Sequence, residues 1–309
     1  MNLPASQRLH GLVAATHTPF HADGSLNLSV VEKQAAHLTK NGVIAAFIGG
    51  TTGESHSLSL EERRALTKRW MEVTRGSELR VIVHAGANCL ADAAALAQQA
   101  QELGAAGVAA LTPSYFKPRS VTVLVESCRQ IASAAPEVPF YFYDIPAMTG
   151  VNLSMVDFLK EARTSIPNLA GLKFTNPDMM SYQLCLQVES GAFDVPWGTD
   201  EALLGALALG ARGAVGSTYN FAAPIYHRLI AAFQSGDLAA AREEQFRSVR
   251  LVQLLASYGF MGAAKAVMTM LGVDVGPARL PNGSPDQAQR VNLEHDLNAL
   301  GFFDWIRPA

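Results

Sequence analysis

Cysteine and charge are both scarce in this sequence. The 309 residues include only three cysteines, Cys89, Cys128 and Cys185, which are widely spaced and form no CxxC pair. They offer no disulfide framework, a pattern typical of a protein in a reducing cytoplasm. Charged residues make up 17% of the chain and the net charge is −3, with Lys and Arg mostly scattered singly. Nothing here favours a nucleic-acid or anionic-membrane surface.

Targeting, membrane and metal signals are missing as well. The segment 1–13 has neither the basic start nor the apolar stretch of a signal peptide. No apolar run reaches the roughly 18 residues that a membrane span requires. The eight histidines are spread along the chain without an HExxH pattern, and no GxSxG elbow is present. We therefore expect a cytoplasmic globular protein with no metal and with neither a membrane nor a nucleic acid as its partner.

What the sequence does contain is a series of short apolar runs rich in Val, Ile and Phe. Stretches with helical spacing lie between most of them, most clearly at Ala91–Leu103 and Ala202–Leu209. The runs alternate with helical stretches along the chain, and within each run polar and apolar residues do not alternate. This pattern predicts a parallel sheet covered by helices. The eight expected strands are Leu12–Ala15, Val43–Gly49, Arg80–Ala85, Gly107–Thr112, Pro139–Ile145, Leu169–Phe174, Phe193–Trp197 and Gly213–Gly216.

Eight strands favour an α/β fold of the closed (β/α)8 TIM-barrel type over an open doubly wound sheet. No GxGxxG follows the first strand, which also counts against a dinucleotide-binding fold. Further helices are expected at Ala222–Phe233, Leu238–Tyr258, Gly262–Leu271 and Gln287–Leu300, the last after a Pro/Gly-rich turn region. We expect one domain, with the barrel over residues 1–221 and a C-terminal helical extension over residues 222–309.

The reactive groups of such a barrel lie where its strands end. The second strand runs into GGTTGE at 49–54, where glycines and the hydroxyls of Thr51 and Thr52 suit a carboxylate or phosphate oxygen. A plain glycine-rich turn explains the same residues. Tyr143 ends the fifth strand and could carry a proton, although its position alone favours a structural tyrosine.

Lys173 is the most informative residue, because it sits between apolar neighbours in a strand that should be buried. A buried lysine has a lowered pKa, and the neutral amine can attack a carbonyl carbon. The alternative is a lysine whose head reaches the barrel rim or pairs with a carboxylate. Lys265 is the rival nucleophile, but we expect it on a helix outside the barrel, where its amine reaches water easily.

Two more strand ends are polar. Gly198-Thr199-Asp200-Glu201 follows the seventh strand, and its carboxylates could accept hydrogen bonds from substrate hydroxyls. They could equally cap the helix that begins near Ala202, with Thr199 or Asp200 at the N-cap. The eighth strand ends in small polar residues that include Ser217.

Together, four motifs at four strand ends resemble the dihydrodipicolinate synthase/N-acetylneuraminate lyase superfamily. They are GGTTGE at 49–54, Tyr-x-Ile-Pro at 143–146, Gly-Leu-Lys at 171–173 and GxDE at 198–201, and the resemblance runs from about Gly11 through the C-terminal helices. The segment 143–151 is similar to the tyrosine loop of the N-acetylneuraminate lyase (sialic acid aldolase) branch. Dihydrodipicolinate synthases normally hold a carboxylate-binding arginine where this chain has Met148, and methionine cannot make that contact.

The resemblance implies a class I aldehyde-lyase of sialic acid catabolism that splits N-acetylneuraminate into N-acetylmannosamine and pyruvate. Lys173 would form the Schiff base, Tyr143 would carry the proton, and Thr51 and Thr52 would hold the carboxylate. The resemblance also implies a homotetramer without a metal or a diffusible cofactor. Tyr115 matches a residue that this superfamily often lends across a subunit interface, and Asp144 and Phe174 would tune the sugar preference. The remaining substrate-binding residues would be Thr175, Gly198, Asp200, Glu201 and Ser217.

Other functions stay open on the sequence alone. A sibling enzyme of the same superfamily could act on a 2-keto-3-deoxy sugar acid, as an aldolase or dehydratase, or resemble dihydrodipicolinate synthase. A barrel that only binds a keto acid is a further alternative. Such a protein could dispense with Lys173 or Tyr143, and both are present.

Overall fold

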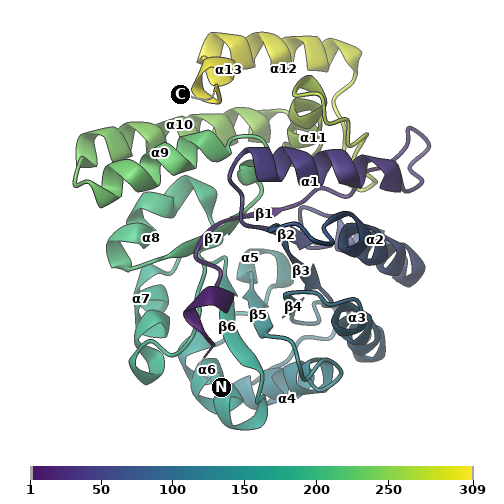
Figure 1. Ribbon diagram of the computed structural model, residues 1–309, viewed down its shortest axis with the longest axis vertical. Helices are drawn as coiled ribbons and strands as arrows, with labels where there is room; N and C mark the ends of the chain where they lie inside the picture. The colour runs from purple at the N-terminus through teal and green to yellow at the C-terminus, as the bar shows by residue number, and fades with distance from the viewer. Residues whose placement is uncertain (1–2, 308–309) are drawn as a thin grey trace.

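Seven parallel strands surround the centre of the molecule (Figure 1) in the computed structural model, which describes residues 3–307. Their order in the sheet is β6-β5-β4-β3-β2-β1-β7. The strands are β1 (Gly11–Ala15), β2 (Ala45–Ile48), β3 (Arg80–His84), β4 (Gly107–Leu111), β5 (Phe140–Asp144), β6 (Leu169–Phe174) and β7 (Gly213–Gly216). Each lies within two residues of the expected bounds.

Residues 193–197 close the sheet between β6 and β7. The amide of Leu172 donates to Asp194 O at 3.0 Å on one side, and the amide of Trp197 donates to Gly213 O at 2.9 Å on the other. The segment makes only isolated bridges to its neighbours, so it is not a regular strand. Pro196 lacks an N–H group and interrupts the ladder at that point. The predicted TIM-barrel architecture is confirmed, with the irregular segment 193–197 in the place of an eighth strand.

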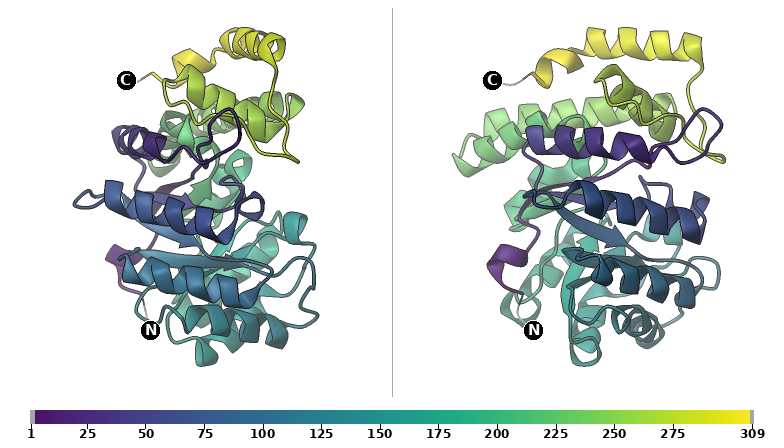
Figure 2. Two further views of the ribbon diagram at one scale, coloured as in Figure 1. Left: turned by 90° about the vertical axis from the view of Figure 1, so that its right-hand side faces the viewer. Right: turned by 45° about the vertical axis from the view of Figure 1, so that its right-hand side comes forward.

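Helices cover the outside of the barrel (Figures 1 and 2). Several of them begin at a side-chain cap, such as Ser59 with Glu62 at α2 and Asp286 with Gln289 at α12. The helices are α1 (Val31–Lys40), α2 (Leu60–Val73), α3 (Leu90–Glu102), α4 (Val121–Ala132), α5 (Pro146–Thr149), α6 (Met155–Ser165), α7 (Met179–Gln187), α8 (Leu203–Leu209), α9 (Ala223–Gln234), α10 (Leu238–Ser257), α11 (Phe260–Met270), α12 (Gln287–Leu300) and α13 (Phe302–Trp305).

The strands separate two apolar clusters. The larger cluster packs the helices against the outer face of the sheet, and the smaller fills the barrel interior. Along β5 the side chains alternate, so that Tyr141 and Tyr143 face inward while Phe140 and Phe142 face the helices. The same alternation on β6 packs Leu172 and Phe174 among the helices and leaves Lys173 for the interior.

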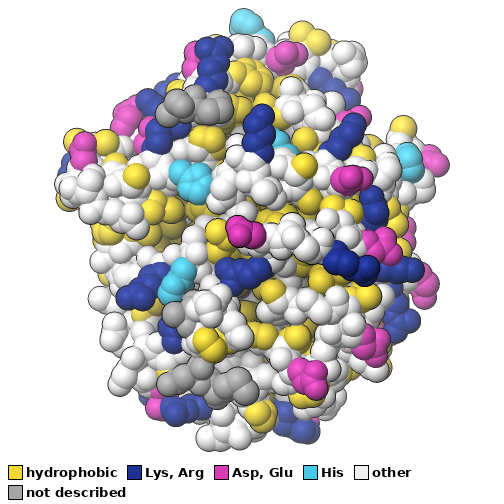
Figure 3. Space-filling model, viewed as in Figure 1, with side chains coloured by type: hydrophobic (Ala, Val, Ile, Leu, Met, Phe, Trp, Pro, Cys, Tyr) yellow, Lys and Arg dark blue, Asp and Glu magenta, His cyan; other side chains and the backbone are white. Residues whose placement is uncertain are grey.

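The C-terminal helices stack at one side of the barrel. In Figure 2, α12 and α13 form the outermost layer, beyond α10 and α11. No single helix within residues 3–307 is long and apolar enough to cross a membrane; α10 and α11 meet the length and composition criteria only as a pair, and they are bent by 111° at their junction. On the face seen in Figure 3, acidic and basic side chains are interspersed rather than gathered by sign.

Candidate active site

A cavity of about 380 Å³ opens at the ends of the strands, where the barrel fold places reactive groups. Nine of the ten residues that the sequence predicts for the site line it. They are Thr51, Thr52, Tyr143, Lys173, Thr175, Gly198, Asp200, Glu201 and Ser217.

Lys173 lies on the wall of this cavity with only 4% of its surface exposed. Its Nζ atom is 3.9 Å from the centroid of the Tyr143 ring and 4.1 Å from that of Phe47. No carboxylate of the described residues lies within ion-pair distance of this amine. Burial lowers the pKa of Lys173 from 10.5 to about 7, and the negative charge of Asp200 offsets part of that decrease.

The two aromatic rings favour the protonated form of Lys173 by less than burial disfavours it. A cation over an aromatic ring gains about 0.5–2 kcal/mol, which favours the protonated amine. A decrease in pKa from 10.5 to about 7 corresponds to about 5 kcal/mol against it. About half of the Lys173 side chains are therefore neutral at pH 7, against roughly one in 3,000 for an ordinary lysine.

Tyr143 is held directly beside this amine. Its hydroxyl shares a 3.2 Å hydrogen bond with Thr51 Oγ1, so the tyrosine of β5 is joined to the loop after β2. Burial raises the pKa of Tyr143 to about 12. The phenol is thus protonated at neutral pH, and it can accept a proton only while passing its own to a neighbour.

The loop 49–54 presents its two threonines to the cavity. Gly49 has φ +62°, in the region that favours glycine, and a Cβ on Gly50 would meet the Phe47 ring at 2.7 Å. Thr52 Oγ1 lies 2.7 Å from Ser217 Oγ, which connects this loop to the end of β7. The glycines are therefore required by the turn itself, and the two hydroxyls line the cavity as well.

Asp200 is a buried carboxylate in the wall of the cavity. Its Oδ2 atom accepts from the amide of Thr218 at 2.8 Å and from the Thr218 hydroxyl at 2.6 Å. Its buried Oδ1 atom has no hydrogen-bond partner among the described residues. Burial raises the pKa of Asp200 to about 6, with the Thr218 hydrogen bonds acting in the opposite direction.

The helix-capping alternative for the segment 199–201 is wrong. Asp200–Ala202 forms a short 3-10 turn, and neither Thr199 nor Ala202 makes a side-chain cap where the turn and α8 begin. The Asp200 carboxylate is directed to Thr218 on the neighbouring strand end instead.

Two glycines make room for polar side chains in the cavity wall. A Cβ on Gly198 would lie 1.9 Å from Thr175 Oγ1, and one on Gly216 would lie 1.6 Å from Asp200 Oδ1. Neither position has space for any other residue while its neighbour stays in place. Gly198 thus contributes to the site by having no Cβ atom, which leaves space for the Thr175 hydroxyl.

Tyr115 is the predicted residue that the fold keeps away from the cavity. It lies on the loop after β4 with 79% of its surface exposed, and its ring packs against Phe116. Asp144 and Phe174, expected to tune the sugar preference, do not line the cavity either. Phe174 packs between Tyr182 and Trp197, and Asp144 accepts from Asn176 Nδ2 at 3.2 Å on the outer face.

The expectation for Lys265 is also wrong. It does lie on a helix outside the barrel, α11, but only 1% of its surface is exposed. Its Nζ atom is 2.8 Å from Glu54 Oε1. The two buried lysines therefore differ in one respect: Lys265 has an anionic partner and Lys173 has none.

The sequence prediction missed several residues of the cavity, among them Thr218, Val252 and Phe260. Thr218 orients Asp200, and its place beside Ser217 in a polar strand end was an available signal. Val252 and Phe260 line the cavity from α10 and α11. Their spacing resembles that of any packed helix, so no local pattern could have identified them.

A nucleophilic amine, a phenol with a hydroxyl relay and a buried carboxylate thus meet in one cavity. This combination suits addition to a carbonyl carbon followed by proton transfer from a hydroxyl. Comparison with known proteins identifies the family in which this arrangement belongs.

The model of the dihydrodipicolinate synthetase family matches residues 8–300. The N-acetylneuraminate lyase of Rattus norvegicus is 39% identical over 303 residues, which cover 97% of this chain and 95% of the rat protein. The structure of Proteus mirabilis N-acetylneuraminate lyase superposes with a TM-score of 0.93 at 41% identity, covering 96% of this chain and 99% of that one. The Aliivibrio salmonicida enzyme of the same name gives a TM-score of 0.93 at 42% identity, covering 96% and 98%. The chain belongs to the dihydrodipicolinate synthetase family.

Proposed function

We propose that this protein is a carbon–carbon lyase that cleaves N-acetylneuraminate into N-acetylmannosamine and pyruvate. The observation that carries the proposal is Lys173, a buried amine without an anionic partner, on the wall of a cavity lined by hydroxyls and a carboxylate. Relatives named N-acetylneuraminate lyase at about 40% identity over nearly the whole chain support this substrate.

The reaction begins with the keto carbon of the open-chain sugar acid. The neutral amine of Lys173 adds to C2, water leaves, and the imine takes up one proton from solvent to become a protonated imine. The C3–C4 bond then breaks, and its electron pair moves into the imine to give an enamine. After the aldehyde leaves, a proton returns to C3 and water releases pyruvate from Lys173.

Bond cleavage requires that the C4 hydroxyl lose its proton. Tyr143 accepts this proton while its own proton passes to Thr51 or to the substrate carboxylate, because a phenol with a pKa of about 12 is not a free base. Thr51 and Thr52, with the amides of their loop, hold the carboxylate. The sugar hydroxyls and the N-acetyl group bind to Asp200, Glu201, Thr175, Gly198 and Ser217.

We further propose that the enzyme is a cytoplasmic homotetramer. The exposed rings of Tyr115 and Phe116 support this, since a large aromatic pair on the surface suits a contact with a second subunit. In that arrangement Tyr115 would reach the cavity of the neighbouring subunit.

Borohydride trapping with pyruvate, followed by peptide mass analysis, tests the chemistry. We expect a reduced pyruvyl adduct on the peptide that contains Lys173 and no adduct in the variant Lys173→Met. An adduct on Lys265 instead, or none on the wild type, would overturn the mechanism.

Substrate profiling tests the specificity. Release of N-acetylmannosamine from N-acetylneuraminate should exceed cleavage of shorter 2-keto-3-deoxy sugar acids by about 100-fold in kcat/KM, because the shorter acids lack the distal hydroxyls that Asp200 and Glu201 would bind. A preference for the shorter acids would assign the chain to a sibling activity.

A further inference from the structure

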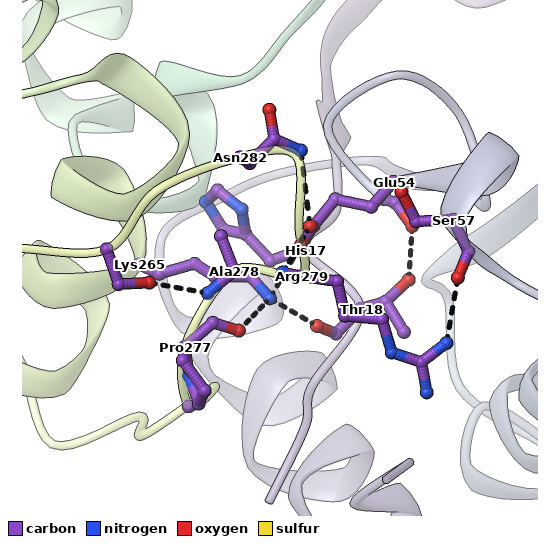
Figure 4. A network of polar contacts seen from close by, with 12 residues as sticks. His17, Thr18, Glu54, Ser57, Lys265, Pro277, Ala278, Arg279 and Asn282 are labelled. Atoms are coloured by element: carbon purple, nitrogen blue, oxygen red, sulfur yellow. Dashed lines mark hydrogen bonds and ion pairs between the residues drawn. The ribbon is translucent and has the colours of Figure 1, made fainter. Parts of the chain in front are cut away.

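A buried ion pair lies beneath the loop 49–54, outside the set of residues that line the cavity (Figure 4). Lys265 and Glu54 form it, and their side chains are 1% and 0% exposed. The two residues come from distant parts of the chain, Lys265 from α11 and Glu54 from the position two residues after Thr52. Buried charges are retained in proteins where they are paired and given further hydrogen bonds.

Lys265 uses its other protons on two backbone carbonyls. Its Nζ atom donates to Thr18 O at 2.9 Å and to Pro277 O at 2.8 Å, and it lies 4.2 Å from the centroid of the Phe20 ring. Burial lowers the pKa of Lys265 to about 8, while the Glu54 carboxylate acts to raise it. The amine is therefore mostly protonated at neutral pH and directed at fixed acceptors.

Glu54 is held from both sides. Its Oε2 atom accepts from the amide of Arg279 at 2.8 Å and from Asn282 Nδ2 at 3.3 Å. Its backbone has φ +54°, a left-handed conformation that is uncommon for a residue with a side chain. Such a conformation persists where surrounding contacts determine it, and it clusters at functional sites.

The residue before Glu54 is fixed as well. The Thr18 hydroxyl donates to Gly53 O at 2.6 Å, and the amide of Glu54 donates to Thr51 O at 3.0 Å. Lys265, by holding Thr18 O, thus acts on the same turn through a second route.

The guanidinium of Arg279 attaches the C-terminal segment to this region. It donates to Ser57 O and Gly24 O, each at 2.8 Å, and pairs with Glu62 on α2. The chain after α11 therefore passes beside Glu54 and Ser57, as Figure 4 shows.

We propose that Lys265 and Glu54, together with Thr18, are positioning residues that fix the turn Thr51–Glu54 in its carboxylate-binding geometry. The inference rests on the proposed function, because it assigns these residues to the pyruvate carboxylate site. The carboxylate is bound in every state along the reaction. A displaced loop should therefore weaken binding while leaving the imine chemistry of Lys173 nearly unchanged.

The test measures pyruvate trapping on Lys173 at increasing pyruvate concentration. Lys265→Met removes the cation at similar volume, and Thr18→Val removes only the hydroxyl that holds Gly53 O. For both we expect the half-saturating pyruvate concentration to rise about tenfold, while the maximal trapping rate changes by less than about threefold. Thr18→Ser, which keeps the hydroxyl, should restore the wild-type value.

Arg228→Met is the control, at an ion pair that is more exposed than that of Lys265. It removes the ion pair that Arg228 makes with Glu244, 2.9 Å apart, between α9 and α10 and away from the loop. It should lower the melting temperature without raising the half-saturating concentration. If Lys265→Met and Thr18→Val leave that concentration within about twofold of the wild type, or if Arg228→Met raises it equally, the inference fails. Thr18→Val decides the matter if Lys265→Met does not fold. Failure of the wild type to trap pyruvate would instead remove the proposed function.

Discussion

Replacing Lys173 by methionine removes an amine whose proton the fold disfavours. In the unfolded chain this lysine holds its proton up to a pKa of 10.5, whereas in the folded protein the pKa is about 7. The folded state thus binds the proton less tightly than the unfolded state. The resulting penalty on the free energy of unfolding is largest below pH 7 and vanishes as the pH rises through 10.5.

The size of the effect follows from these two values. The penalty is about 4 kcal/mol at pH 7 and about 2 kcal/mol at pH 9. Methionine has a similar volume and no charge to bury, so Lys173→Met should be more stable than the wild type by up to these amounts. For a chain of this length the melting temperature should rise by about 6 °C at pH 7 and about 3 °C at pH 9.

The same substitution at Lys265 supplies the comparison. Lys265→Met leaves Glu54 buried without its cation, and breaking one side of a buried pair destabilises by about 3–5 kcal/mol. Thermal unfolding followed by circular dichroism, at one protein concentration for all three proteins, measures both effects. If Lys173→Met melts below the wild type at pH 7, or if its advantage is the same at pH 7 and pH 9, then burial does not depress the pKa as argued.

Three further outcomes are expected. The rate of pyruvyl-adduct formation on Lys173 at subsaturating pyruvate should fall about tenfold per pH unit below pH 7 and level off above it, whereas a midpoint near pH 10 would contradict a lowered pKa. Asp200→Asn should move that midpoint below 7, since the Asp200 charge raises the pKa of Lys173; an unchanged midpoint would mean that the two groups do not interact. Thr51→Val should lower kcat for cleavage by about 100-fold while the maximal trapping rate with pyruvate changes little, and equal losses in both would remove Thr51 from the proton relay.

The barrel and most of its site could be predicted because their signals are local. The end of each strand can be recognised from a few neighbouring residues. A lysine between apolar neighbours in a strand can be recognised in the same way. Strand alternation also explains why Phe174 lies away from the cavity, since consecutive side chains of a strand face opposite ways and Lys173 faces the cavity. The same reasoning applies to Asp144, which follows the inward-facing Tyr143.

The environment of Lys265 could not be predicted in this way. Its partners are Glu54, Thr18 and Pro277, and only the last is near it in the sequence. On a helix with small apolar neighbours, a lysine that reaches water and one that is buried have the same local pattern. Only the folded chain shows which carboxylate and which carbonyl groups surround it.

Gly198 and Gly216 carry a consequence for redesigning the sugar preference. Each glycine and the side chain above it occupy a single volume, Gly198 with Thr175 and Gly216 with Asp200. A library that varies Thr175 alone samples only residues that tolerate the existing gap, and one that varies Gly198 alone yields clashes. Positions 200 and 216 form one mutational unit, because a Cβ on Gly216 meets only side-chain atoms of Asp200. A Cβ on Gly198 also lies 2.9 Å from the backbone oxygen of Phe174, so a smaller residue at position 175 does not make room there. Searches for new aldehyde acceptors should therefore keep Gly198, and exchange Gly216 for a larger residue only where residue 200 becomes smaller.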